Sequence, residues 1–103
     1  MTRIEKLIQY MDEHGKESFL QQALAEEYIK AGNDDAARNV LNELLLREST
    51  YITAYIHLGN ILVRVGDEAK AIRIFRRGML EATKAENRAV LNELQEALEE
   101  IIY

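Results

Sequence analysis

The chain has 103 residues, of which 48% are hydrophobic and 30% are charged, and its formal net charge is −5 at pH 7. This composition excludes a disordered chain and predicts one globular domain over residues 1–103 that buries its own core. The acidic balance argues against nucleic acid or an anionic membrane surface as the main partner.

The chain carries neither a recognisable secretion signal nor an apolar segment long enough to span a bilayer. Its start, "MTRIEKLIQYMDEHG", is charged throughout, and no apolar run approaches the roughly 18 residues that a span needs. Cysteine is absent, which excludes disulfides, thiolate metal sites and cysteine nucleophiles. We therefore expect a cytoplasmic protein without a membrane partner.

Hydrophobic periodicity predicts six helices with short links and no strand. In chain order the helices cover residues 2–14, 18–31, 34–48, 52–65, 68–83 and 87–102. The first has one apolar stripe, made by Ile4, Leu7, Ile8 and Met11. Gly15 is its expected stop, and Ser18 with Gln21 predicts a capping box for the second helix.

Two glycine pairs divide the middle of the chain at a regular interval. Gly32-Asn33 and Gly66-Asp67 each place a residue that tolerates left-handed backbone before an N-cap residue, 34 residues apart. A shift of 34 also superimposes the following residues: Leu24 on Leu58, Ala37 on Ala71, Leu46 on Leu80, Ile29 on Val63, Lys30 on Arg64, Val40 on Ile74 and Leu41 on Phe75. The sequence therefore contains two copies of a helix-pair repeat.

This repeat resembles the tetratricopeptide repeat, whose pattern is W-x2-L-G-x2-Y, then A-x3-F, then P, over about 34 residues. The second copy offers Tyr55, Leu58, Gly59, Leu62, Ala71 and Phe75. The first copy offers Gln21, Leu24, Ala25, Tyr28, Ala37 and Leu41. Both copies lack the closing proline, where Ser49 and Thr83 stand. The resemblance covers residues 18 to about 84, and it places small residues where the paired helices pack closely.

The resemblance implies an all-α fold, a right-handed α-α superhelix of about six antiparallel helices. The single domain would then consist of a flanking helix 2–14, a first repeat 18–51, a second repeat 52–85 and a capping helix 87–102. The last helix has a narrow apolar stripe, made by Leu91, Leu94, Leu98 and Ile101. Its other face is polar, with Arg88, Asn92, Gln95, Glu96 and Glu99. A narrow stripe with a polar back is typical of a capping helix.

The fourth predicted helix is apolar almost all round, except for one line made by Thr53, His57, Asn60 and Arg64. Their spacing places these side chains on one helix face. Because the first helix of each tetratricopeptide repeat lines the concave face, the resemblance implies that this line faces a groove. The matching positions one repeat earlier are Phe19, Ala23, Glu26 and Lys30, and further lining is expected from Gln22, Ile29, Ile56 and Val63. Each of these residues could instead be ordinary solvated surface.

A groove with a basic edge and an apolar lining suits a peptide that carries carboxylates. We therefore predict a non-catalytic scaffold that binds a peptide or protein segment. Some members of the family hold a C-terminal carboxylate with a clamp of lysine, asparagine and arginine residues. Asn60 could belong to such a clamp, but other positions differ from it: Gln22, Glu26, His57 and Leu91. We do not expect a clamp of that kind.

Two other functions stay open at this point. The chain could be a structural homo-oligomer, such as a homodimer, that buries groove residues or the apolar tail of residues 101–103. RNA recognition in the manner of pentatricopeptide arrays is the third, although two repeats could read only about two bases. Since the groove is not strongly basic, we expect no nucleic-acid partner.

We expect no enzyme, cofactor or metal site. The two histidines, His14 and His57, lie on different predicted helices without a conspicuous carboxylate pair. All five glycines are isolated, so no loop is expected to cradle a phosphate. The basic stretch "RIFRR", with Arg73, Arg76 and Arg77, is interpreted as a solvated helix face.

Overall fold

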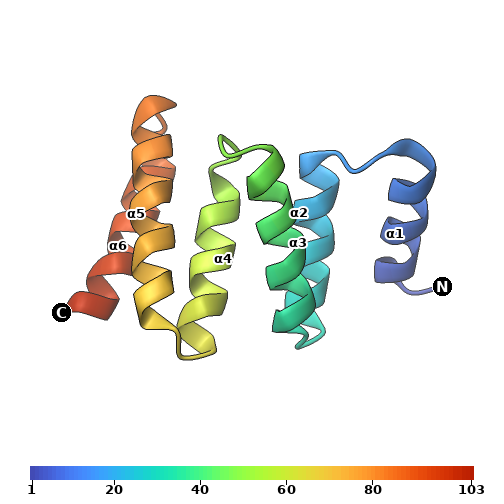
Figure 1. The fold of residues 1–103 in the computed structure, drawn as a ribbon, viewed down its shortest axis with the longest axis horizontal. Coiled ribbons are helices and arrows are strands. Elements are labelled where there is room, and N and C mark those ends of the chain that lie inside the picture. Colours follow the sequence, from blue (N-terminus) through green and yellow to red (C-terminus); the bar gives the residue numbers. More distant parts are fainter. The chain divides into compact units, whose positions relative to one another are not determined.

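The computed structural model describes residues 1–103, all of whose regular structure is helical (Figure 1). Its helices are α1 (Arg3–His14), α2 (Ser18–Lys30), α3 (Asp34–Arg47), α4 (Thr53–Arg64), α5 (Glu68–Lys84) and α6 (Arg88–Ile102). Each predicted helix is confirmed, and its ends lie within one residue of the predicted ends. The all-α class is therefore confirmed.

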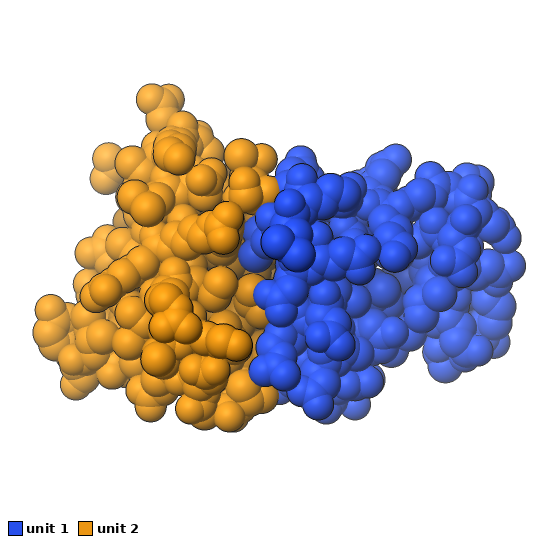
Figure 2. All heavy atoms as spheres, in the orientation of Figure 1, with its two compact units in different colours: residues 1–48 blue, residues 49–103 orange.

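The chain divides into two compact units, unit 1 (Met1–Glu48) and unit 2 (Ser49–Tyr103) (Figure 2). Unit 1 contains α1, α2 and α3, and unit 2 contains α4, α5 and α6. The predicted repeat boundaries and the single domain over residues 1–103 stay predictions.

In unit 1, α2 and α3 form an antiparallel pair, and α1 packs against α2 (Figure 1). The core of the pair consists of Leu24, Ala25, Ala37, Leu41, Leu44 and Leu45. Of the predicted stripe on α1, Met11 is buried, Ile4 and Leu7 are half-buried, and Ile8 is exposed. The stripe is therefore covered mainly at its C-terminal end.

In unit 2, α5 packs against both α4 and α6, and α4 also contacts α6. The largest fully buried side chains are Tyr55, Leu58, Ile61, Phe75 and Leu94. On α6, Leu94 and Leu98 of the predicted stripe are buried, while Leu91 and Ile101 are half-buried. The sequence analysis missed Val90, which is buried as well.

Close packing inside unit 2 depends on two glycines. A Cβ atom at Gly59 would lie 2.2 Å from the ring of Phe75, and one at Gly78 would lie 2.6 Å from Cβ of Tyr55. Real Cβ contacts are essentially never this short, so a side chain at either position would force the Phe75 ring or the Tyr55 side chain to shift in a tightly packed core. Gly59 is one of the predicted small residues, and the other three, Ala25, Ala37 and Ala71, are fully buried. The expectation of close helix pairing at these sites is confirmed.

Three helix ends share one backbone turn. After α2, α4 and α5, a residue with positive φ is followed by an N-cap residue, and the N-cap amide donates to a carbonyl five residues back. Gly32 and Gly66 take the positive φ at the two predicted turns, with φ of 77° and 85°. Glu86 takes it at the third, with φ of 55°. The side chains of Asn33, Asp67 and Asn87 then cap α3, α5 and α6.

The predicted capping box at Ser18 and Gln21 is wrong. Glu17 is the N-cap of α2, and no side chain caps this helix end. The Ser18 hydroxyl instead donates to a carboxylate oxygen of Glu48, and Arg47 donates to both Ser18 and Gln21. Both predicted residues are buried, so their polar atoms serve contacts between α2 and the end of α3. A box of the predicted type does occur on α1, between Thr2 and Glu5.

Candidate functional site

Most of the predicted groove residues of α2 line one cleft of unit 1. Phe19, Ala23, Glu26 and Lys30 all line a cleft of about 460 Å³ between α1 and α2. The remaining lining consists of Arg3, Lys6, Leu7, Tyr10, Leu20 and Glu27. Phe19 is 57% exposed and Tyr10 is 50% exposed, so two large aromatic side chains are open to solvent here. We call this surface the α1–α2 cleft.

Two ion pairs lie in this cleft, one between α1 and α2 and one within α2. The carboxylate of Glu27 lies 2.9 Å from Nε of Arg3 and 3.7 Å from Nζ of Lys30. The Glu27 side chain is 12% exposed, whereas those of Arg3 and Lys30 are 83% and 74% exposed. The half-buried carboxylate therefore anchors two cations whose side chains stay largely exposed to solvent.

Sequence reasoning missed the contribution of α1 to this cleft. It used one apolar stripe of this helix, but Arg3, Lys6, Leu7 and Tyr10 form a second face. Their spacing of three, four and seven residues from Arg3 was visible in the sequence. This face contains both cationic and apolar side chains, so apolar periodicity alone does not reveal it.

Two predicted residues of α2 lie outside the α1–α2 cleft. Gln22 and Ile29 are both half-buried. Nε2 of Gln22 donates to a carboxylate oxygen of Glu26 at 3.4 Å, along the same helix face. This contact steadies Glu26, which does line the cleft.

In unit 2, some predicted binding residues of α4 are exposed, and the others are half-buried or buried. Asn60 and Val63 line a second cleft, of about 360 Å³, with residues of α5 and α6 that include Ala97 and Glu100. We call it the α4–α6 cleft. Val63 is 39% exposed, and Arg64 is exposed next to it. Thr53 and His57 are half-buried, while Ile56 is only 8% exposed and offers little surface.

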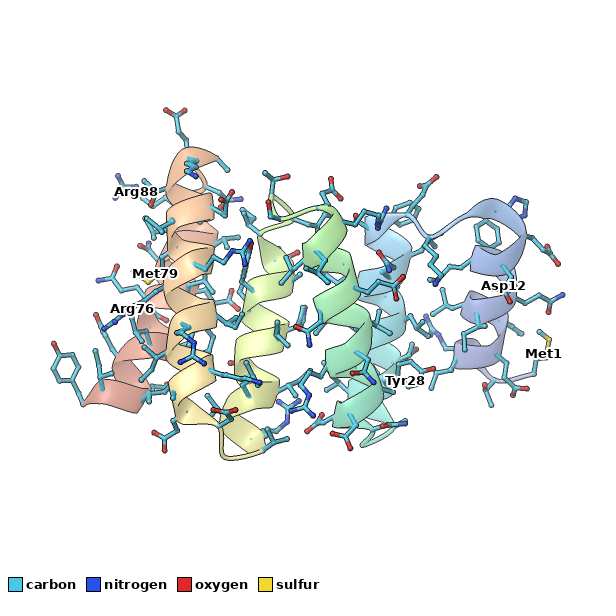
Figure 3. The ribbon with its side chains drawn as sticks, viewed as in Figure 1. Met1, Asp12, Tyr28, Arg76, Met79 and Arg88 are labelled. Carbon is cyan, nitrogen blue, oxygen red and sulfur yellow. The ribbon has the colours of Figure 1, made fainter.

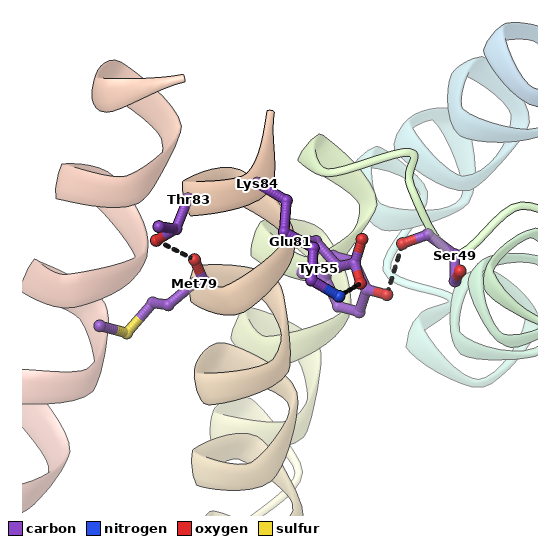
Figure 4. A network of polar contacts seen from close by, with 6 residues as sticks. All are labelled: Ser49, Tyr55, Met79, Glu81, Thr83 and Lys84. Carbon is purple, nitrogen blue, oxygen red and sulfur yellow. Dashed lines mark hydrogen bonds and ion pairs between the residues drawn. The ribbon is translucent and has the colours of Figure 1, made fainter. Parts of the chain in front are cut away.

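The hydroxyl of Tyr55 could in principle act as a functional group, but the side chain lies in the core. The side chain is fully buried, and its hydroxyl donates to the backbone carbonyl of Ser49 at 2.7 Å (Figure 4). Burial raises the pKa of the Tyr55 hydroxyl above its ordinary value of 10.0. A neutral, buried and hydrogen-bonded phenol is a structural group.

Two contacts near Tyr55 stabilise the C-terminal end of α5 (Figure 4). Lys84 forms an ion pair with Glu81, and the Thr83 hydroxyl donates to the Met79 carbonyl.

The structure contains no group of three or more His, Cys, Asp and Glu side chains that could hold a metal ion. His14 is exposed at the end of α1, where its ring lies 4.3 Å from that of Tyr10. The arginines of the basic stretch are exposed on α5, as Figure 3 shows for Arg76. None of the six helices is long and apolar enough to cross a membrane.

Solved structures resemble this chain, whereas no protein-family model and no curated protein matches its sequence. A tetratricopeptide repeat domain protein from Salinibacter ruber is 29% identical in its crystal structure, with a TM-score of 0.81 over 84% of this chain and 96% of that chain. Its solution structure has a TM-score of 0.79 at 29% identity, over 82% of this chain and 86% of that chain. The solution structure of a protein from Bordetella parapertussis is 26% identical, with a TM-score of 0.87 over 99% of this chain and 89% of that chain.

Proposed function

Because this chain is a small helical repeat protein of tetratricopeptide-like fold, we propose that it is a non-catalytic scaffold that binds a peptide or protein segment. Proteins of this fold generally mediate protein–protein interaction. The residues proposed to bind lie on α2 in unit 1 and on α4 in unit 2, the first helices of the two repeats. No nucleic acid, cofactor or metal takes part in this proposal, and the cytoplasmic location stays a prediction.

Exposed apolar side chains beside cations on these two helices carry the proposal. Phe19 is 57% exposed on the same helix face as Lys30, and Val63 is 39% exposed beside Arg64. Apolar side chains that are exposed beside one another favour a partner surface, because their burial on binding lowers the free energy. The cations beside them suit carboxylates on that partner.

A random peptide display selection on the immobilised chain tests the proposal. It is run in parallel on three variants: Asn60→Ala combined with Arg64→Glu, Lys30→Glu, and Arg73→Glu. The last variant is a matched control, because Arg73 is an exposed arginine of α5 outside the predicted surface. Circular dichroism and thermal melting verify that all chains fold equally.

We expect a peptide motif that is enriched on the unchanged chain and on the Arg73→Glu control. At least one of the α2 and α4 variants should lose that motif, because its charge reversal repels the carboxylates of a peptide bound at that helix. Absence of any motif from the unchanged chain would contradict the proposal. So would the same motif on all four chains.

A structural homo-oligomer is the second candidate function, and the C-terminal residues favour it. Ile102 is 44% exposed and Tyr103 is 97% exposed. Light scattering over a range of concentrations would detect self-association as a mass above that of one chain. A variant with Ile102→Ser and Tyr103→Ser would then return the mass to that of a monomer. A mass of one chain at every concentration excludes this candidate.

A further inference from the structure

The helix order of unit 2 shows what kind of element packs on a helix pair like α1 and α2. The link from α1 to α2 has the same length as the link from α5 to α6, three residues in each case. In unit 2 a third helix, α4, packs against both members of the α5–α6 pair. Such a pair therefore offers a surface that an α-helix can cover.

Positions of α2 that line the α1–α2 cleft match positions of α6 that line the α4–α6 cleft, when both are counted from the start of the helix. Ala97 and Glu100, nine and twelve residues after the first residue of α6, line the α4–α6 cleft together with Asn60 and Val63 of α4. Glu27 and Lys30 stand nine and twelve residues after the first residue of α2, and both line the α1–α2 cleft. Counted from the start of each helix, the same positions of α6 and α2 thus line a cleft beside a neighbouring helix.

The lining of the α1–α2 cleft defines the chemistry of a helix that would fit it. Its apolar part is made by Leu7, Tyr10, Phe19, Leu20 and Ala23. Arg3, Lys6 and Lys30 supply three positive charges, against two negative charges from Glu26 and Glu27. Glu27 already contacts Arg3 and Lys30, whose side chains nevertheless stay largely exposed. The outer edge of the cleft is therefore cationic although the whole chain carries a net charge of −5.

We propose that the α1–α2 cleft binds an amphipathic α-helix of a partner protein, with an apolar face flanked by carboxylates. The apolar face covers Phe19, Tyr10 and the aliphatic floor between α1 and α2. The flanking carboxylates pair with Lys6, Arg3 and Lys30, which gives the site its preference for acidic helices. This inference rests on the proposed function, because α2 contributes residues to both, but it assigns the helix a place on α1 that the proposed function does not use.

Two display libraries of helical peptides of about 14 residues, a usual helix length, test the proposal. Both carry Leu, Ile or Val along one face. The flanking positions are Glu in the acidic library and Lys in the basic library. Selected peptides are then titrated against the unchanged chain and against Lys6→Glu, Arg64→Glu and Lys70→Glu variants. Lys70 is an exposed lysine of α5, so its reversal is the matched control.

We expect enrichment from the acidic library alone. Lys6→Glu should weaken binding of the selected peptides by about fivefold or more, because it turns an attraction at the cleft into a repulsion. Lys70→Glu should leave the affinity within about twofold, because Lys70 lines neither cleft. Binding that is insensitive to Lys6→Glu, or equal enrichment from both libraries, overturns the proposal.

The outcomes separate this inference from the proposed function. Peptides that are lost on Arg64→Glu but not on Lys6→Glu overturn the helix site and leave the proposed function in place. A concentration-dependent dimer that Lys6→Glu dissociates overturns the inference in another way, because the occupant would then be a second copy of this chain. Lys6 is exposed, so its reversal is expected to leave the fold intact, and thermal melting verifies this.

Discussion

Glu86 is the non-glycine residue that adopts a backbone conformation better suited to glycine. It ends α5 with φ of 55°, in the turn where Gly32 and Gly66 end α2 and α4. Left-handed backbone costs an ordinary residue about 1 kcal/mol or more, because Cβ crowds the carbonyl oxygen, whereas glycine has no Cβ. The repeat thus keeps the geometry of its turn even where the residue that suits it is missing.

We predict that Glu86→Gly stabilises the chain by about 1 kcal/mol. Chemical denaturation measures the change in the free energy of unfolding. Gly66→Ala is the matched control in the opposite direction and should lower stability by a similar amount, because nothing lies within 4 Å of a Cβ at Gly66 and only φ opposes it. An unchanged or lower stability of Glu86→Gly would show that the turn carries no such strain.

Tyr55 makes the stability of unit 2 sensitive to high pH. Because burial raises the pKa of Tyr55 in the folded chain, the unfolded chain releases this proton first as the pH rises past 10.0. Folding stability is therefore fully present below pH 10 and decreases above it. The bond from Tyr55 to the Ser49 carbonyl is worth about 1 kcal/mol while the phenol stays neutral.

The Tyr55→Phe variant should be less stable than the unchanged chain by about 1 kcal/mol at neutral pH. This difference should shrink as the pH rises above 10, since phenylalanine has no proton to lose. Urea denaturation of both chains between pH 8 and pH 11 measures it. A difference that stays constant across this range would contradict a raised pKa of Tyr55.

Single residues also show where sequence patterns stop being informative. Ser18 and Gln21 have the spacing of a capping box, but burial against the end of α3 directs them to Arg47 and Glu48 instead. Leu46 and Leu80 match across the repeat, yet they are 90% and 65% exposed. Local spacing cannot reveal either outcome, because both depend on which distant residue lies nearby.

At the scale of elements, the packing of α4 on α5 depends on the absence of a side chain at Gly59. We predict that Gly59→Ala lowers stability by about 2 kcal/mol, because the new Cβ would overlap the ring of Phe75 and force the helices apart. The higher helix propensity of alanine offsets only part of this cost. Chemical denaturation provides the measurement.

Asn60→Ala is the control for this prediction, since Asn60 is the next residue of α4 and is exposed. It should change stability by less than about 0.5 kcal/mol. If Gly59→Ala were as stable as this control, α4 and α5 would not pack as closely as the structure shows.

The helices were the most predictable part of this chain. Their ends follow from glycine, cap residues and apolar periodicity, which are local properties of the sequence. Gly78 was not predicted as a close contact, because it meets Tyr55 on another helix and nothing local marks it. The cationic face of α1 was not predicted either, because cations do not contribute to apolar periodicity.

At the scale of the whole molecule, the predicted binding residues fall into two groups, one in each unit. Phe19, Glu26 and Lys30 line the α1–α2 cleft, and Asn60 and Val63 line the α4–α6 cleft. The sequence could indicate the helix faces, because the repeat places equivalent residues 34 positions apart. It could not indicate the clefts, because their other walls come from α1 and α6, outside the matching repeats.

Chemical-shift mapping by NMR tests whether the first helices of the two repeats bind a protein segment. The isotope-labelled chain is titrated with a peptide from the random display selection. We predict that the largest amide shifts occur in α2 and α4, within Ser18–Lys30 and Thr53–Arg64. Largest shifts within α3 and α5 instead, on residues such as Leu46 and Leu80, would contradict the claim and place binding on the second helices of the repeats.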